Sequence, residues 1–85
     1  MKDAPIEAQT RLVLENLKAV LAAENLTMAH IVSTTFYMKD LNDFGKMNDV
    51  YASFFSGVTP ALATVQVARL PRDAKIEIAV IAGRR

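Results

Sequence analysis

The sequence predicts an α+β protein in which two helices lie on one face of a small mixed β-sheet, in the order helix, strand, helix, strand, strand. Apolar residues recur at helical spacing over residues 5–24, and a β-branched and aromatic run follows at residues 31–38. A second helical stripe then leads into a last third that reads as two strands. Helical connections between strands favour helices on the same sheet face. A chain of 85 residues allows one domain, residues 1–85.

The composition favours an oligomer. The chain is 52% hydrophobic and only 22% charged, which is apolar for a domain of this size, because much of a small domain is surface. We therefore expect a subunit interface. The formal net charge of +1 provides no broad basic field, so the composition does not support nucleic-acid binding.

Several kinds of site are disfavoured by what the sequence lacks. Without cysteine there is no disulfide or thiolate chemistry, and the single histidine, His30, has no carboxylates at ligand spacing. His30 is read more simply as a turn or surface residue than as a catalytic one. We expect neither a metal nor an organic cofactor. The N-terminus resembles neither a signal nor a presequence, and no apolar run reaches membrane-spanning length, which predicts a cytoplasmic protein.

The first helix is predicted over residues 5–24. Asp3, Pro5 and Glu7 suit a helix start, and Asn25 suits a left-handed stop. Its apolar face consists of Thr10, Val13, Leu14, Leu17, Val20 and Leu21. A capped turn at Thr27 then leads into the strand at residues 31–38. Both faces of that strand are apolar or hydroxylic, so we expect it to be central and covered on both sides.

The second helix is predicted to open at Asn42 and Asp43. Its buried stripe consists of Phe44, Met47, Tyr51, Phe54 and Phe55. Asn48 falls on the same stripe, where an amide must find hydrogen-bond partners or destabilise the fold. Two interpretations stay open: Asn48 is a structural pin, or it is a site residue.

The last third carries the most informative residue of the sequence. Two strands are broken by Pro71-Arg72-Asp73, and the second contains the carboxylate Glu77 between aliphatic residues. If burial raised its pKa toward neutrality, Glu77 could act as a base on a water molecule. Alternatively it forms a surface ion pair with Lys39, Lys75, Arg69 or Arg72. Pattern alone favours the ion pair.

Three segments strongly resemble the RidA/YjgF family, also called the L-PSP or reactive-intermediate deaminase family. They are residues 8–21 (AQTRLVLENLKAVL), 47–55 (MNDVYASFF) and 65–78 (VQVARLPRDAKIEI). The resemblance implies a chorismate-mutase-like fold and a homotrimer with active sites in the clefts between subunits. It further implies hydrolysis of small-molecule enamines and imines, such as 2-iminobutanoate and 2-iminopropanoate, to 2-oxo acids and ammonia. Some family members are instead assigned an endoribonuclease or translation-inhibitor activity.

The resemblance also assigns candidate site residues. By motif position, the glutamate that orients or activates water is Glu77, the helix asparagine is Asn48, and a Cys or Thr position of the pocket is Thr64. The family's carboxylate-binding arginine follows Pro-Ala, and here Pro60-Ala61 is followed by Leu62. A leucine cannot hold a carboxylate, so we expect weak or absent deaminase activity on carboxylate-bearing imines. A non-catalytic trimer that binds a small ligand, or serves in assembly, is the alternative.

The part of the family that this sequence resembles begins just before the family's first helix. The family's N-terminal strands and their tyrosine-bearing motif have no counterpart in this sequence. Those strands would pair beside the last strand, so residues 75–82 are predicted to form an unpaired, mostly apolar edge. We expect such an edge to pair with something, so that either subunits meet through it or the trimer is remodelled.

Overall fold

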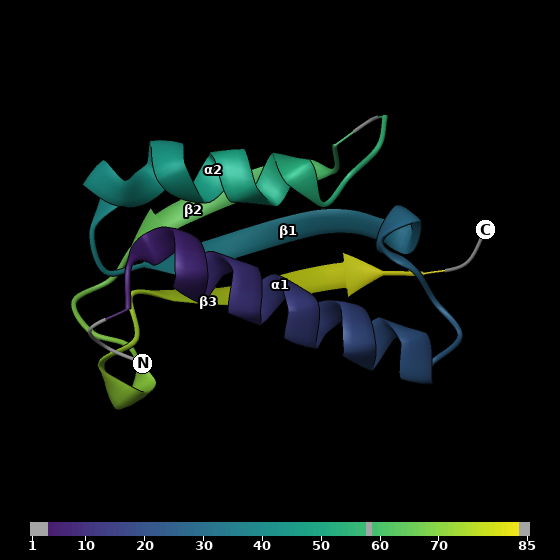
Figure 1. The fold of residues 1–85 in the computed structure, drawn as a ribbon, viewed down its shortest axis with the longest axis horizontal. Coiled ribbons are helices and arrows are strands. Elements are labelled where there is room, and N and C mark those ends of the chain that lie inside the picture. The colour runs from purple at the N-terminus through teal and green to yellow at the C-terminus, as the bar shows by residue number, and fades with distance from the viewer. Residues whose placement is uncertain (1–3, 58, 84–85) are drawn as a thin grey trace.

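The computed structural model of the chain describes residues 4–57 and 59–83. Its elements occur in the predicted order (Figure 1). The helices and strands are α1 (Ile6–Ala23), β1 (Ile31–Met38), α2 (Phe44–Ser53), β2 (Ala61–Gln66) and β3 (Ile76–Ala82). Short 3-10 turns precede β1, α2 and β3, at Met28–His30, Leu41–Asp43 and Pro71–Asp73. The α+β class and the helix, strand, helix, strand, strand order are confirmed.

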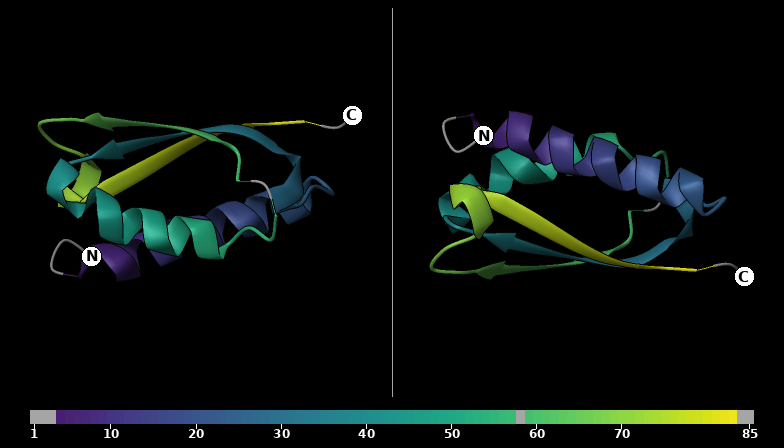
Figure 2. Two further views of the ribbon diagram at one scale, coloured as in Figure 1. Left: turned by 90° about the horizontal axis from the view of Figure 1, so that it is seen from above. Right: turned by 90° about the horizontal axis from the view of Figure 1, so that it is seen from below.

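The sheet is mixed and has the strand order β2-β1-β3. β1 pairs with β2 in parallel and with β3 in antiparallel orientation. The central position predicted for β1 is therefore confirmed, and β3 forms one edge of the sheet in the part of the chain that the structure describes. Figure 2 shows both helices on the same side of the sheet.

The core lies between the sheet and the two helices. β1 contributes Phe36, and the helices contribute Leu14 and Tyr51; none of these three side chains is measurably exposed. The rings of Phe36 and Tyr51 meet edge to face, with centroids 5.2 Å apart. The Tyr51 hydroxyl donates a 2.9 Å hydrogen bond to Thr34 Oγ1, also in the core. Burial raises the pKa of Tyr51, so the fold holds this phenol in its neutral form.

The second face of the sheet, which we call the open face, is not covered by any described element of the chain. It consists of Ser33, Thr35 and Tyr37 of β1, flanked in register by Ala61, Ala63 and Val65 of β2 and by Ile81, Ala79 and Glu77 of β3. The β1 side chains on this face are half-buried, and those of the outer strands are exposed. The prediction that β1 is covered on both sides is wrong for the single chain, because both helices lie on the other face.

The helix ends differ in part from the predicted ones. Asn25 has φ 59°, which confirms the left-handed stop, whereas Asp3 lies outside the described residues. Before α2, Asp40 rather than Asn42 caps the 3-10 turn, since its Oδ1 accepts a 2.9 Å hydrogen bond from the Asn42 backbone N–H. Phe54 and Phe55 follow the end of α2 and are half-buried there. The predicted buried stripe is also too wide, because Phe44 is 38% exposed.

Candidate functional site

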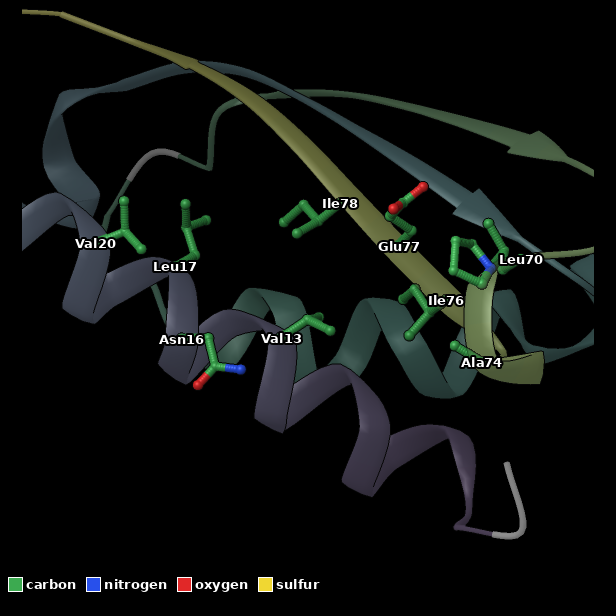
Figure 3. Close-up of a pocket in the computed structure, with 10 residues that line it drawn as sticks. Val13, Asn16, Leu17, Val20, Leu70, Ala74, Ile76, Glu77 and Ile78 are labelled. Carbon is green, nitrogen blue, oxygen red and sulfur yellow. The ribbon is translucent and has the colours of Figure 1, made fainter. Parts of the chain in front are cut away.

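Glu77 lies on the open face of β3, where its side chain is exposed. Its register partner is Tyr37 of β1. Strand alternation sends the neighbouring Ile76 and Ile78 to the helix side, and Figure 3 shows the Glu77 carboxylate turned away from α1. The carboxylate is therefore available to solvent or to another molecule.

The ion-pair interpretation of Glu77 is wrong for the single chain. Arg69 pairs with Asp73 at 3.0 Å, and Lys75 Nζ donates to the Ala4 carbonyl oxygen at 2.8 Å. Within residues 4–57 and 59–83 no ion pair reaches Glu77. A carboxylate without a partner on a mostly apolar sheet face is a better candidate for function than for stability.

Leu62 and Thr64 lie on the opposite, helix-facing side of the sheet. Their register partners on β1 are Thr34 and Phe36, and Leu62 packs half-buried against the hydrophobic core. The Thr64 Oγ1 atom is buried, and no described residue accepts or donates a hydrogen bond there. Leaving a buried hydroxyl without a partner typically costs about 1–3 kcal/mol, so Thr64 suits a place where a ligand or another chain supplies one.

Asn48 lies on α2, next to the buried Met47, and is half-buried. Its side chain makes no hydrogen bond to the described residues. The interpretation of Asn48 as a structural pin therefore finds no support in the single chain. The amide remains free to bind another molecule.

The single chain does not bring these candidates into one pocket. Leu62 and Thr64 share a strand and a face, but β1 separates β2 from β3, and Glu77 points to the other face. Two strand spacings alone amount to about 9.6 Å. A site that uses both Glu77 and Thr64 must therefore draw them from different copies of the chain.

Sequence reasoning missed a groove between α1 and β3, which we call the α1–β3 groove. It has a volume of about 370 Å³ and is lined chiefly by Val13, Leu17 and Val20 of α1 and by Ile76 and Ile78 of β3 (Figure 3). Val20 is 63% exposed although it belongs to the predicted apolar face of α1. The sequence did contain a signal for this groove, because the apolar face predicted for α1 is wider than a three-stranded sheet can cover.

Two negative findings concern the described part of the chain. No group of three or more His, Cys, Asp or Glu side chains is placed to hold a metal ion among residues 4–57 and 59–83. Nor is any helix within those ranges long and apolar enough to cross a membrane. His30 sits in a capping turn, where its Nδ1 accepts a 2.9 Å hydrogen bond from the Thr27 backbone N–H, which matches its expected role as a turn residue.

Two helices over a small mixed sheet define a class of α+β proteins with solved representatives. The structure of Escherichia coli TdcF with bound serine superposes with a TM-score of 0.92 at 45% sequence identity, over 96% of this chain and 67% of that one. A family model described as Endoribonuclease L-PSP matches residues 1–83. The chain belongs to this family, that of the RidA/YjgF proteins, which confirms the resemblance.

Two curated relatives are similar over nearly the whole chain. Protein DfrA of Myxococcus xanthus is 50% identical over 82 residues, which cover 96% of this chain and 63% of that protein. The 2-iminobutanoate/2-iminopropanoate deaminase of Salmonella typhimurium is 49% identical over 83 residues, which cover 94% of this chain and 65% of that enzyme. This chain therefore spans less than two thirds of the length of either relative.

Proposed function

We propose that the chain is a RidA-type scaffold for hydrolysis of small imines and enamines, with weak activity on substrates that carry a carboxylate. The observation that carries the proposal is the environment of Leu62, which packs half-buried against the core where the resemblance implies a carboxylate-binding arginine. The 49% identity to an imine deaminase supports the reaction class. The serine bound by the related TdcF has a carboxylate of the kind that Leu62 cannot hold.

The proposed active unit is a homotrimer with sites between copies. The uncovered, mostly small and apolar open face supports an assembly in which another copy covers it. In that assembly Glu77 of one copy faces a cleft that Asn48 and Thr64 of the next copy complete. The opposite directions of Glu77 and Thr64 in one chain support a two-chain site over a one-chain site.

The proposed chemistry is a redox-neutral hydrolysis. Glu77 accepts a proton from water while the water oxygen bonds to the imine carbon, and the proton is passed to the nitrogen. The hydroxyl proton of the resulting carbinolamine then passes to the nitrogen as the carbon–nitrogen bond breaks, giving a carbonyl product and ammonia. Thr64 Oγ1 and the Asn48 amide orient the substrate or the water by hydrogen bonds.

Replacement of the arginine affects binding more than chemistry. A bidentate arginine–carboxylate contact is worth about 1.5–3 kcal/mol or more when shielded from water. The substrate carboxylate takes no part in the bond changes of the hydrolysis. Loss of the arginine contact therefore weakens binding of the substrate and of the transition state equally. Small imines without a carboxylate are therefore the better substrates for this chain.

The test is ammonia release from 2-iminobutanoate generated in situ and from an imine of similar size that lacks the carboxylate. The wild type is expected to turn over 2-iminobutanoate slowly, and Leu62→Arg to increase turnover. In the Leu62→Arg background Glu77→Gln is expected to abolish turnover, whereas the matched control Glu7→Gln, at an exposed position of α1, keeps it. Fast wild-type turnover of 2-iminobutanoate that Leu62→Arg leaves unchanged would refute the assignment to Leu62.

The alternative is a non-catalytic trimer that binds a small uncharged ligand or serves in assembly. The apolar packing of Leu62 favours it, and it predicts no ammonia release by wild type or Leu62→Arg with either imine. The endoribonuclease named in the family description is a weaker alternative, because a net charge of +1 gives little attraction for a phosphate backbone.

A further inference from the structure

Tyr37 lies directly opposite Glu77 on the open face, because the two are register partners in the antiparallel pair of β1 and β3. At the end of this pair the Lys39 N–H donates a 3.1 Å hydrogen bond to the Lys75 carbonyl oxygen. Hydrogen-bonded pairs alternate along an antiparallel ladder, so Tyr37 and Glu77, two residues further along each strand, form the next such pair. The Cβ atoms of directly opposite residues lie about 4.5–5.5 Å apart. The phenol and the carboxylate can therefore reach the same small molecule.

The hydroxyl of Tyr37 has no role in the fold of the single chain. Among the register positions that define the open face, Tyr37 is the one aromatic side chain, and it is half-buried. Its hydroxyl makes no hydrogen bond to residues 4–57 and 59–83. Tyr51, by contrast, is buried on the other side of the sheet with its hydroxyl bonded inside the core. The Tyr37 hydroxyl is therefore free to bind another molecule.

Covering the open face would make an unbonded hydroxyl destabilising. In the proposed assembly another copy covers this face, and a buried hydroxyl without a partner costs about 1–3 kcal/mol. A phenylalanine would present the same ring to that copy without this loss. The register partners of Tyr37 on the neighbouring strands are Val65 and Glu77, and of these two Glu77 is the polar one. The hydroxyl is therefore placed to act together with the carboxylate.

Imine hydrolysis needs a proton donor as well as a proton acceptor. While Glu77 takes a proton from water, the imine nitrogen must gain one, because the electron pair of the carbon–nitrogen double bond moves onto it. An ionised carboxylate only accepts hydrogen bonds, whereas a phenol hydroxyl can both donate and accept them. Tyr37 and Glu77 thus supply the two complementary groups from opposite positions of one strand pair.

We propose that Tyr37 is the proton donor of the imine site, an inference that rests on the proposed function and deepens it. As the water oxygen bonds to the imine carbon, Glu77 takes a proton from the water and Tyr37 Oη gives its proton to the nitrogen. The proton on Glu77 then passes to the phenolate oxygen, which leaves both groups as they began. The net change is addition of water across the carbon–nitrogen double bond, with no oxidation or reduction.

The test compares variants in the Leu62→Arg background by ammonia release from 2-iminobutanoate generated in situ. Tyr37→Phe should lower kcat by about tenfold or more and leave KM within about twofold, because the lost proton transfer occurs only during the reaction. Ser33→Ala is the matched control, since it removes a hydroxyl from the same strand and face, opposite Ile81, and it should change neither constant. Sedimentation and thermal melting should show that Tyr37→Phe keeps the assembly and the fold.

The outcomes separate this inference from the proposed function. Full turnover by Tyr37→Phe, in a background where Glu77→Gln abolishes turnover, would overturn the role of Tyr37 and leave the proposed function standing. A raised KM with unchanged kcat would make Tyr37 a binding residue and not a proton donor. Equal losses of kcat in Tyr37→Phe and Ser33→Ala would assign the Tyr37 hydroxyl to subunit packing and would equally overturn the proposal. If Leu62→Arg released no ammonia from either imine, the proposed function and this inference would fail together.

Discussion

The hydrogen bond between Tyr51 and Thr34 gives the most direct test of the core. It joins α2 to the central strand at 2.9 Å, and the two side chains are 0% and 2% exposed. Tyr51→Phe removes the donor and leaves Thr34 Oγ1 buried without a partner, since water does not reach it. We expect the free energy of unfolding to fall by about 1–3 kcal/mol, and the melting temperature to fall by about 4–8 °C for each kcal/mol.

The matched control is the double-mutant cycle with Thr34→Val. Each single change leaves one buried polar atom unpaired, whereas the double change leaves none. The double variant should therefore be more stable than the sum of the single effects predicts, by about 1 kcal/mol. Urea unfolding of the four proteins measures this coupling. Additive effects would show that the hydroxyls do not act as a pair and would refute the reasoning.

Two further predictions concern the same part of the core. Because the pKa of Tyr51 is higher in the folded than in the unfolded chain, stability should be unaffected by Tyr51 below about pH 10 and should fall as pH rises above it. Tyr51→Phe should remove this part of the pH dependence of stability. Tyr37→Phe, at a half-buried position of the open face, should keep this pH dependence. Urea unfolding of the two variants between pH 8 and about pH 11 measures these effects. Phe36→Ala should destabilise by about 3–5 kcal/mol, since Phe36 is 0% exposed and packs on Tyr51. A change in the urea midpoint equivalent to less than 1 kcal/mol would mean that Phe36 is not central to the core.

The order of helices and strands could be predicted because the spacing of apolar residues that distinguishes a helix from a strand is a local property of the sequence. The apolar spacing of residues 5–24 and the left-handed stop at Asn25 both correspond to observed structure. The end of α2 could not be predicted in the same way. Phe54 and Phe55 continue the helical spacing, but α2 stops at Ser53, and the two rings pack from the segment that follows. Tertiary packing here overrides the periodic pattern.

The turn before β3 was predicted as a break, but its conformation was not. Pro71 ends the preceding extended segment, and both Arg72 and Asp73 adopt positive φ, at 59° and 54°. Such angles are uncommon for residues other than glycine and are held by surrounding structure. The Arg69–Asp73 ion pair at 3.0 Å spans this turn. No local propensity of Arg72 indicates a left-handed conformation.

The sequence could supply candidate site residues, but it could not supply their geometry. Strand alternation correctly separates Glu77 from Ile76 and Ile78. That Glu77 and Thr64 point to opposite faces depends on strand order and on the parallel pairing of β2, which are long-range properties. The α1–β3 groove depends in the same way on how far α1 extends past β3.

The roles proposed for Leu62 and Glu77 allow substrate binding and water activation to be tested separately. Leu62 and Glu77 lie on different strands and opposite faces, so a change at either residue leaves the other in place. An arginine at position 62 would contact a carboxylate that is the same in substrate and transition state, and it should lower KM with little change in kcat. Under the proposed function, Glu77→Gln removes a proton acceptor that is needed only during the reaction, and it should lower kcat. If Leu62→Arg raised kcat without lowering KM, position 62 would act on the reacting atoms, and the division of roles proposed for these two residues would be wrong.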